Sequence, residues 1–180
     1  MILLMGIAGS GKGTQGRLLA EKDGYNLIST GELLRNYGSK EQHERMNNGE
    51  ILGDEEVTKL LKKALEEIEN QNNVILDGYP RRLSQAEWLL RESKTGKFQV
   101  SSVIHLIASK KAVKTRLLDR ARNDDHDNGI EQRFKDFEQD TAPILNYLIK
   151  SGVRLKEVNA ERPVEEVRTE IVNWLRELTH

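Results

Sequence analysis

The sequence predicts an α/β protein in which strands and helices alternate around a parallel sheet. Three short apolar runs have the length of buried strands: Met1 to Met5, Val74 to Asp77 and Ser101 to Ile107. A fourth run, Val153 to Val158, alternates apolar and polar residues as a half-exposed strand does. The segments between these runs carry apolar residues at every third or fourth position, which is typical of helices with one buried face. Strands that alternate with helices indicate a parallel sheet.

Length and composition indicate one well-solvated globular domain. The chain has 180 residues, of which 37% are hydrophobic and 32% are charged. The net charge of −1 gives no overall attraction to nucleic acid or to an anionic membrane. No apolar stretch approaches the roughly 20 residues of a membrane-spanning helix. We therefore expect no nucleic-acid partner and no membrane partner.

The absence of cysteine excludes disulfides and thiolate metal sites, and it is compatible with a reducing compartment. The N-terminal apolar run is about one strand long and lacks the basic leader of a signal peptide. No coiled-coil pattern or exposed apolar stripe argues for assembly. We therefore expect a cytoplasmic monomer.

The most informative stretch is Gly6 to Thr14, which follows the first apolar run and precedes a helical pattern. Its G-x-x-x-x-G-K spacing between a strand and a helix is that of a phosphate-binding loop. The glycines let successive N–H groups turn toward an anion, and the helix start adds free donors. Lys12 adds a mobile positive charge for the outer phosphates. A glycine-rich turn with a surface lysine is the alternative, but the length and context of the pattern favour a nucleoside phosphate site.

After the first helix, Gly24 to Ile28 predicts a short strand. Ser29 has capping-box spacing to the glutamate three residues later, so we expect Ser29 to cap a helix and to do nothing more. Thr30 and Arg35 on that helix are not explained by capping.

The next segment, 36–50, is polar and helical in composition with few core candidates, and Gly49 is expected to end its helix. Asp54 is expected to cap another helix, whose apolar residues recur at helical spacing from Val57 to Ile68. The stretch from about residue 30 to residue 56 therefore predicts a small mobile subdomain with little core of its own.

Asp77 ends the second apolar strand. An acid at the carboxyl end of a strand in this class of fold lies near the phosphate crevice. Its hard oxygens suit Mg²⁺, held directly or through water, whereas a plain capping Asp is the alternative. Gly78 to Arg82 follow, and Gln85 lies on the next helix.

In the C-terminal half, Arg116 and Arg120 lie one helical turn apart, which alone indicates no more than a solvated stripe. The charged stretch 120–129 breaks the periodicity, and a helix resumes at Ile130 with Pro143 kinking or restarting it. Pro163 is expected to open a last helix. The residues expected to be buried on that helix are Val164, Val167, Ile171, Trp174 and Leu178.

Together these stretches resemble the adenylate kinases. The resemblance rests on five motifs in order: Gly9 to Gln15; Ile28 to Arg35; Leu76 to Arg81 with Gln85 and Ala86 after it; Arg116 and Arg120 with the Arg122-x-Asp124-Asp125 element and Arg133; and Asn159 to Glu161. It implies a P-loop NTPase-type, three-layer α/β/α fold with a central parallel sheet of about five strands. It also implies a single kinase domain, 1–180, with a helical NMP-binding subdomain at 29–58 and a very short lid loop at 120–130.

The resemblance implies reversible phosphoryl transfer from Mg·ATP to AMP, which gives two ADP and serves nucleotide homeostasis. The attacking group is a phosphate oxygen that is already anionic, so no general base is needed. The chemistry instead requires in-line positioning and cations around the transferred group. Arginine suits this task because its planar fork grips phosphate in two places and stays charged.

Individual roles are implied by matching positions. The catalytic positions are Lys12, Arg81, Arg120, Arg122 and Arg133. The ATP-binding positions are Gly9, Ser10, Gly11, Lys12, Gly13, Thr14, Arg116, Arg120 and Arg162. The AMP-binding positions are Thr30, Arg35, Glu50, Ile51, Leu52, Gly78, Tyr79, Pro80, Arg81, Gln85, Arg122 and Arg133. Asp77 matches the position that orients Mg²⁺ through water, and no zinc is expected.

Thr30 and Gln85 match the adenine-side positions of adenylate kinases, where the similar UMP/CMP kinases typically carry Ala and Asn. Two alternatives remain: a kinase for another monophosphate such as UMP or CMP, and a nucleotide-binding protein without turnover. The largest departure from the family is the lid, because only Ala121 separates Arg120 from Arg122. We expect this short lid to exclude water from ATP less well than a long one.

Overall fold

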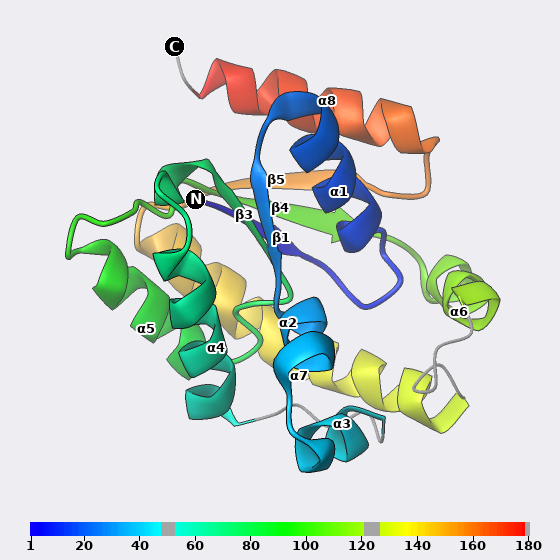
Figure 1. Cartoon of the computed structure of the whole chain (residues 1–180). Coiled ribbons are helices and arrows are strands. Elements are labelled where there is room, and N and C mark those ends of the chain that lie inside the picture. The colour runs from blue at the N-terminus through cyan, green and yellow to red at the C-terminus, as the bar shows by residue number, and fades with distance from the viewer. Residues whose placement is uncertain (48–52, 121–126, 179–180) are drawn as a thin grey trace.

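The computed structural model describes residues 1–47, 53–120 and 127–178 (Figure 1). Its centre is a parallel sheet of five strands in the order β2-β3-β1-β4-β5. The strands are β1 Ile2–Met5, β2 Asn26–Ser29, β3 Val74–Asp77, β4 Ser102–Ile107 and β5 Arg154–Asn159. The prediction of a parallel α/β sheet is confirmed.

Helices cover both faces of this sheet, as Figure 1 shows. They are α1 Lys12–Asp23, α2 Thr30–Tyr37, α3 Lys40–Asn47, α4 Asp54–Glu66, α5 Leu83–Ser93, α6 Lys110–Arg120, α7 Asp127–Lys150 and α8 Val164–Glu177, with a short 3₁₀ turn, η1, at Gln71–Asn73. Helices α1 and α8 lie on one face, and α4, α5 and α7 lie on the other.

Strand β1 explains why the sheet has this three-layer form. Its residues alternate between two cores: Ile2 and Leu4 pack toward α1 and α8, whereas Leu3 and Met5 pack toward α4, α5 and α7. All four of these side chains are buried. A strand that is apolar on both faces requires a helical layer on each side, which is the usual environment of a central parallel strand.

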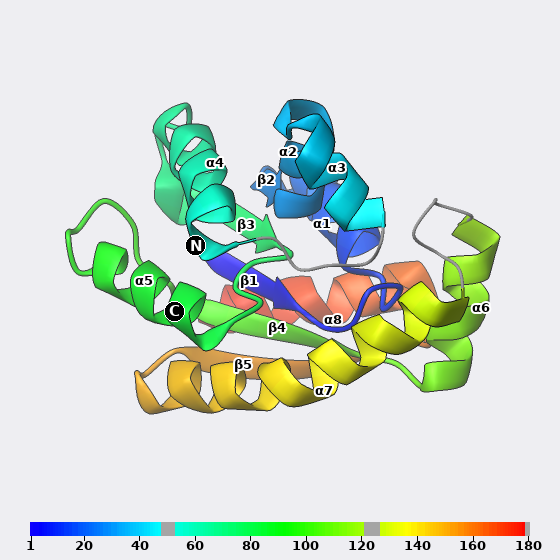
Figure 2. The same ribbon diagram turned by 90° about the horizontal axis from the view of Figure 1, so that it is seen from below.

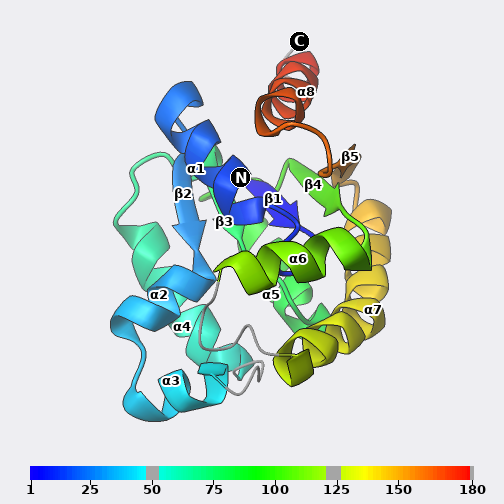
Figure 3. The same ribbon diagram turned by 90° about the vertical axis from the view of Figure 1, so that its right-hand side faces the viewer.

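The carboxyl ends of the parallel strands meet at one edge of the sheet. In the strand register Asp77 lies beside Ser29 on β2 and beside Leu4 on β1. The chain leaves β1 into the glycine-rich loop at this same edge. Helices α2 and α3 stand on one side of that loop and α7 on the other (Figures 2 and 3).

The cap prediction for Ser29 is confirmed in position only, and the cap prediction for Asp54 is wrong. Ser29 precedes α2, but its side chain makes no cap hydrogen bond, and its Oγ lies 3.4 Å from Asp77 Oδ2 instead. Asp54 is the first residue of α4, and Gly53 occupies the N-cap position. The N–H of Gly53 donates to Glu56 Oε2 at 3.0 Å, so the glutamate closes this helix start.

Other differences concern the C-terminal half. Pro143 lies inside α7, which continues to Lys150. Val164 is 48% exposed rather than buried, because α8 buries only one stripe, formed by Val167, Ile171 and Leu175. The expected helix end at Gly49 lies outside the described residues. Among the residues that are described, no helix is both long and apolar enough to span a membrane.

Candidate active site

A cleft of about 670 Å³ opens at the carboxyl edge of the sheet. Its walls are the loop after β1, the turn after β3, and parts of α2, α6, α7 and α8. Among the described residues its lining includes seven cations, namely Lys12, Arg17, Arg35, Arg81, Arg116, Arg133 and Arg162. It also includes five acids, namely Glu32, Asp77, Asp119, Asp136 and Asp140. An excess of cationic over acidic side chains in one cleft suits a polyanionic ligand.

The loop between β1 and α1 requires glycine at two crowded positions. Gly6 has φ of 139°, and a Cβ there would lie 2.5 Å from the carbonyl oxygen of Leu106. Gly9 has φ of 84°, and a Cβ there would lie 2.9 Å from Leu117 Cγ. These glycines let the loop pass close to β4 and α6 and return to start α1 at Lys12. The first N–H groups of α1 then point toward the cleft with the positive end of the helix dipole.

Lys12 is held inside this loop. Its Nζ donates to the carbonyl oxygens of Gly6 at 2.7 Å and Ile7 at 3.0 Å. The ammonium group therefore lies within the curve of the loop, where a bound phosphate would also lie.

Asp77 lies at the end of β3 and is 9% exposed. Its Oδ2 is 3.9 Å from the point where a Cβ on Gly13 would lie, so the carboxylate faces the first turn of α1. Among the described residues, no three carboxylate, imidazole or thiol groups gather as a metal site. A cation held here would take its other ligands from phosphate and water, which is the mode that Mg²⁺ prefers, so the donor set fits.

Arg35 on α2 and Arg81 after β3 also line the cleft. Arg81 Nε donates to the carbonyl oxygen of Gly78 at 3.0 Å, and Arg35 has no carboxylate partner among the described residues. The pKa of Arg81 is lowered, mainly because the surrounding protein desolvates its charged form. The negative charge of Asp77 raises this pKa, and the positive charge of Arg35 lowers it. Solvent still reaches Arg81 through the open cleft, and an arginine keeps its charge at neutral pH. Two neighbouring guanidinium groups have the charge and the donors that suit a dianionic phosphate.

Thr30 and Gln85 are buried and do not line the cleft. Thr30 Oγ1 donates to the carbonyl oxygen of Gly78 at 2.9 Å, and Gln85 Oε1 accepts from the N–H of Arg81 at 2.7 Å. Gln85 Nε2 also donates to Asp54 Oδ1 at 3.0 Å. Both side chains therefore hold the turn from Gly78 to Arg81, a role that the sequence did not reveal. In the same turn, Tyr79 and Pro80 are buried.

The cleft is also lined by Arg116 from α6, Arg133 from α7 and Arg162 from the loop before α8. Arg116 Nη2 donates to the carbonyl oxygen of Ala160 at 2.9 Å. Arg162 pairs with Glu170 on α8. Those cationic residues that the sequence analysis identified and whose side chains are described all line this one cleft, namely Lys12, Arg35, Arg81, Arg116, Arg133 and Arg162.

Several expected site residues cannot be placed. Arg120 is the last residue of α6 and its side chain is not described. Arg122, Glu50, Ile51 and Leu52 lie outside the described residues, as does most of the expected lid loop.

Sequence reasoning missed part of the α7 wall, namely Asp136, Phe137 and Asp140. These residues lie three, four and seven positions after Arg133, so they share its helix face. That spacing was the signal that could have identified them.

Comparisons with known proteins show which family the chain resembles. A sequence model of the adenylate kinase family matches residues 4–153. The adenylate kinase of Corynebacterium urealyticum is 34% identical over 172 residues, which cover 92% of this chain and 93% of that protein. Adenylate kinase 1 of a Nostoc species is 35% identical over 178 residues, covering 94% of this chain and 95% of its own. The adenylate kinase of Brucella ovis is 31% identical over 186 residues with the same coverage.

Proposed function

Because the chain belongs to the adenylate kinase family, we propose that its cleft binds Mg·ATP at the glycine-rich loop and AMP at Arg35 and Arg81. The enzyme is a phosphotransferase, a nucleoside monophosphate kinase of the adenylate kinase type. The observation that carries the proposed arrangement is that the pair Arg35 and Arg81 lines the same cleft as Lys12. Two phosphate-binding sites in one cleft suit a reaction in which the γ-phosphate of ATP faces the phosphate of AMP.

The transfer itself needs no proton movement. A phosphate oxygen of AMP forms a bond to the γ-phosphorus of ATP, and the bond from that phosphorus to the β–γ bridging oxygen breaks. The electron pair stays on the leaving ADP, and the product is a second ADP. The protein contributes alignment and positive charge around the transferred group.

Lys12 and the N–H groups of Gly9 to Thr14 hold the donor phosphates. Arg35 and Arg81 hold the AMP phosphate, which fixes the attacking oxygen in line. Arg116 and Arg162 act on the ATP side, whereas Arg120, Arg122 and Arg133 close over both phosphate chains. Removing one such electrostatic contact from a transition state typically costs about 10²- to 10³-fold in rate.

Asp77 is the proposed anchor for Mg²⁺, which it orients through water. When bound with ATP, the cation supplies neutralising charge at the phosphate oxygens. The Ser29 hydroxyl, 3.4 Å from Asp77 Oδ2, steadies the carboxylate in this direction.

AMP is the proposed acceptor. The argument rests on Thr30 and Gln85, which match adenine-side positions, with Glu50, Ile51 and Leu52 contributing backbone to the same pocket. In this structure the side chains of Thr30 and Gln85 are both buried outside the cleft and hold the turn from Gly78 to Arg81, so their proposed influence on base choice acts through that turn.

We also propose that the enzyme acts as a monomer in the cytoplasm. The large apolar side chains that are most exposed among the described residues are scattered over separate elements: Tyr37, Leu83, Ile107, Leu118, Ile149 and Val164. Scattered apolar residues do not form the contiguous patch that a stable dimer needs. Sedimentation of the purified chain tests this point.

The decisive experiment is phosphorus NMR of the protein with Mg·ATP and, in turn, AMP, CMP, UMP and GMP. Rapid ADP formation with AMP alone, lost in Lys12→Met, is the expected result. Turnover with a pyrimidine monophosphate would overturn the base assignment and leave the mechanism intact. Nucleotide binding without turnover for every acceptor would identify a binding protein instead.

A further inference from the structure

Gln15 is a buried polar side chain in the first turns of α1, directly after the phosphate-binding residues Gly13 and Thr14. Gln15 is 3% exposed and is one of the residues that line the cleft. Its Nε2 donates to the carbonyl oxygen of Val164, the first residue of α8, at 2.9 Å. A carbonyl can only accept, so this contact identifies the amide atom as nitrogen. The bond joins two segments that lie 149 residues apart in the sequence.

Packing alone does not explain an amide at this position. Gln15 Oε1 is buried and has no hydrogen-bond partner among the described residues. An unpaired buried acceptor is destabilising. A methionine of similar length would fill the same space without that penalty. The amide therefore serves something other than packing.

The segment 160–164, whose last residue accepts the hydrogen bond from Gln15, forms one wall of the cleft. Ala160, Arg162 and Val164 all line the cavity. They follow β5, which lies at the opposite end of the strand order from β2 and β3, the strands that lead to Arg35 and Arg81. Because the outer phosphate of the donor faces the proposed acceptor site at Arg35 and Arg81, the base of the donor points to the other side of the glycine-rich loop, where this wall lies.

Other contacts tie this wall to different elements. The Ala160 N–H donates to Ile107 of β4, and the Ala160 carbonyl oxygen accepts from Arg116 of α6 at 2.9 Å. Glu161 Oε1 accepts from the Ser109 N–H at 2.8 Å. The contact from Gln15 links the wall to the helix that carries the phosphate-binding N–H groups.

We propose that Gln15 is a positioning residue for the base of the donor nucleotide, which it serves by fixing the distance between the phosphate loop and the Ala160–Val164 wall. This inference rests on the proposed binding of ATP at the glycine-rich loop. Gln15 touches neither phosphate nor base in this arrangement. It makes the wall and the loop one rigid receptor, so that the base contacts and the phosphate contacts form together.

Comparing ATP with tripolyphosphate isolates this role, because tripolyphosphate occupies the loop and has no base. In Gln15→Met the Kd for ATP should rise about fivefold to tenfold, the loss expected for one hydrogen bond. The Kd for tripolyphosphate should stay within about twofold of the wild-type value. In turnover assays the KM for ATP should rise, whereas the KM for AMP and kcat should not.

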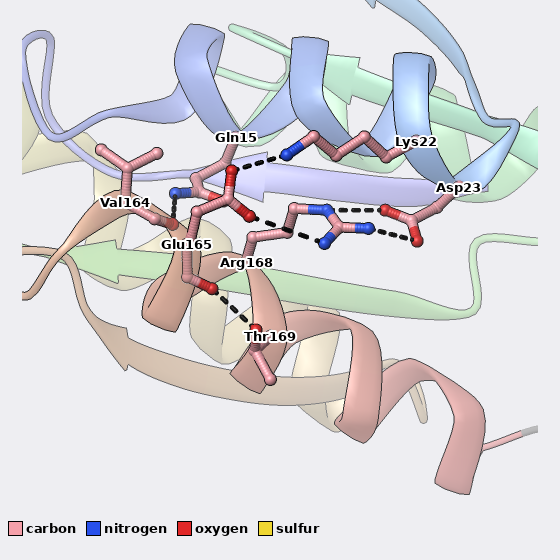
Figure 4. Close-up of polar contacts among 7 residues, drawn as sticks. All are labelled: Gln15, Lys22, Asp23, Val164, Glu165, Arg168 and Thr169. Atoms are coloured by element: carbon pink, nitrogen blue, oxygen red, sulfur yellow. Dashed lines mark hydrogen bonds and ion pairs between the residues drawn. The ribbon is translucent and has the colours of Figure 1, made fainter.

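The matched control is Arg168→Met. Arg168 joins the same two helices through Asp23, with Nε–Oδ2 and Nη2–Oδ1 distances of 3.0 and 2.8 Å. Figure 4 shows this pair beside the Gln15–Val164 contact, together with Lys22, Glu165 and Thr169. Neither Arg168 nor Asp23 lines the cleft. The control should lower the melting temperature and leave both dissociation constants unchanged.

Equal weakening of ATP and tripolyphosphate in Gln15→Met would mean that the loop itself is distorted, and it would overturn the proposal. An unchanged Kd for ATP would overturn it as well. Failure of the proposed function is separate: it would appear as a wild-type protein that makes no ADP from ATP and AMP. The binding ratio between the two ligands still tests Gln15 in that case.

Discussion

The ammonium nitrogen of Lys12 lies 2.7 Å from the carbonyl oxygen of Gly6, so the lysine folds back across the loop that carries it. A second contact, 3.0 Å to the carbonyl oxygen of Ile7, holds the same group. Phosphate oxygens carry full negative charge and are stronger acceptors for an ammonium group than carbonyls are. The ammonium group of Lys12 is therefore preorganised, and it needs only a small movement to contact a bound triphosphate.

Replacing Lys12 by methionine should reduce the rate of ADP formation at least about 100-fold, because the loop loses its only mobile charge near the transferred group. The far-UV circular dichroism should not change, since Lys12 contributes no core contact. Steady-state rates with saturating Mg·ATP and AMP measure the effect.

Lys22→Met is the control for this prediction. Lys22 lies on the same helix and pairs with Glu165 at 2.7 Å near the surface. Its rate should stay within about twofold of the wild-type value, as removing an exposed ion pair changes little. Comparable losses in both variants would contradict a specific role for Lys12.

Arg35→Met and Arg81→Met should each raise the KM for AMP by about tenfold or more, because a charge-assisted contact to the acceptor phosphate is lost. The KM for ATP should change much less. Arg91→Met, at an exposed position on α5, is the matched control and should change neither value. An equal rise in the two KM values would argue against an acceptor site at Arg35 and Arg81.

Most of the fold could be predicted from local patterns. Strands β1 and β3 are short runs that are apolar up to Asp77 because both of their faces are buried, and such runs are visible without the structure. Strand β4 is recognisable in the same way from Val103, Ile104 and Leu106. The caps of α2 and α4 could not be predicted in the same way. The Ser29 hydroxyl turns to Asp77, a residue 48 positions away, and no local pattern reveals such a partner.

The site residues also differ in whether local sequence patterns could predict them. Lys12, Asp77 and Arg81 belong to short motifs whose spacing carries their chemistry, and the structure brings them to one cleft. The internal bonds of Thr30 and Gln85 depend on how α2, α4 and α5 pack around the turn after β3. Tertiary packing of this kind leaves no periodic trace in the sequence.

Thr30→Val should lower the free energy of unfolding by about 1 kcal/mol, because the half-buried Gly78 carbonyl loses the donor at 2.9 Å and keeps only the contact from Arg81 Nε. The turn from Gly78 to Arg81 should loosen, so the KM for AMP should also rise. Urea unfolding and steady-state kinetics measure the two effects.

Thr95→Val provides the comparison for Thr30. The Thr95 hydroxyl donates to the nearby Glu92 carbonyl oxygen at 2.7 Å on an exposed turn. Its loss should change stability by less than about 0.5 kcal/mol. Thr30→Val that unfolds like the wild type would show that the buried hydroxyl contributes nothing to the turn.

His105 should make stability depend on pH below neutrality. It lies on β4 with its ring against Phe137, the centroids being 6.0 Å apart, and its Nδ1 is 3.4 Å from Glu157 Oε1. Burial lowers the pKa of His105 below its ordinary value of 6.5, Glu157 acts in the opposite direction, and the charge of Lys12 lowers it further. A folded-state pKa below the unfolded value means that the unfolded chain takes up the proton first as the pH falls.

The contribution of His105 to stability is therefore fully present above about pH 6.5 and is lost as the pH falls toward the lower, folded-state pKa. His105→Gln should flatten the fall in unfolding free energy between about pH 7 and 5, measured by urea titration at several pH values. Glu157→Gln should steepen it, because the group that raises the pKa of His105 is gone. If His105→Gln retains the wild-type slope, other groups cause the pH dependence. Opposite changes of slope in the two variants are the result that a buried, uncharged imidazole requires.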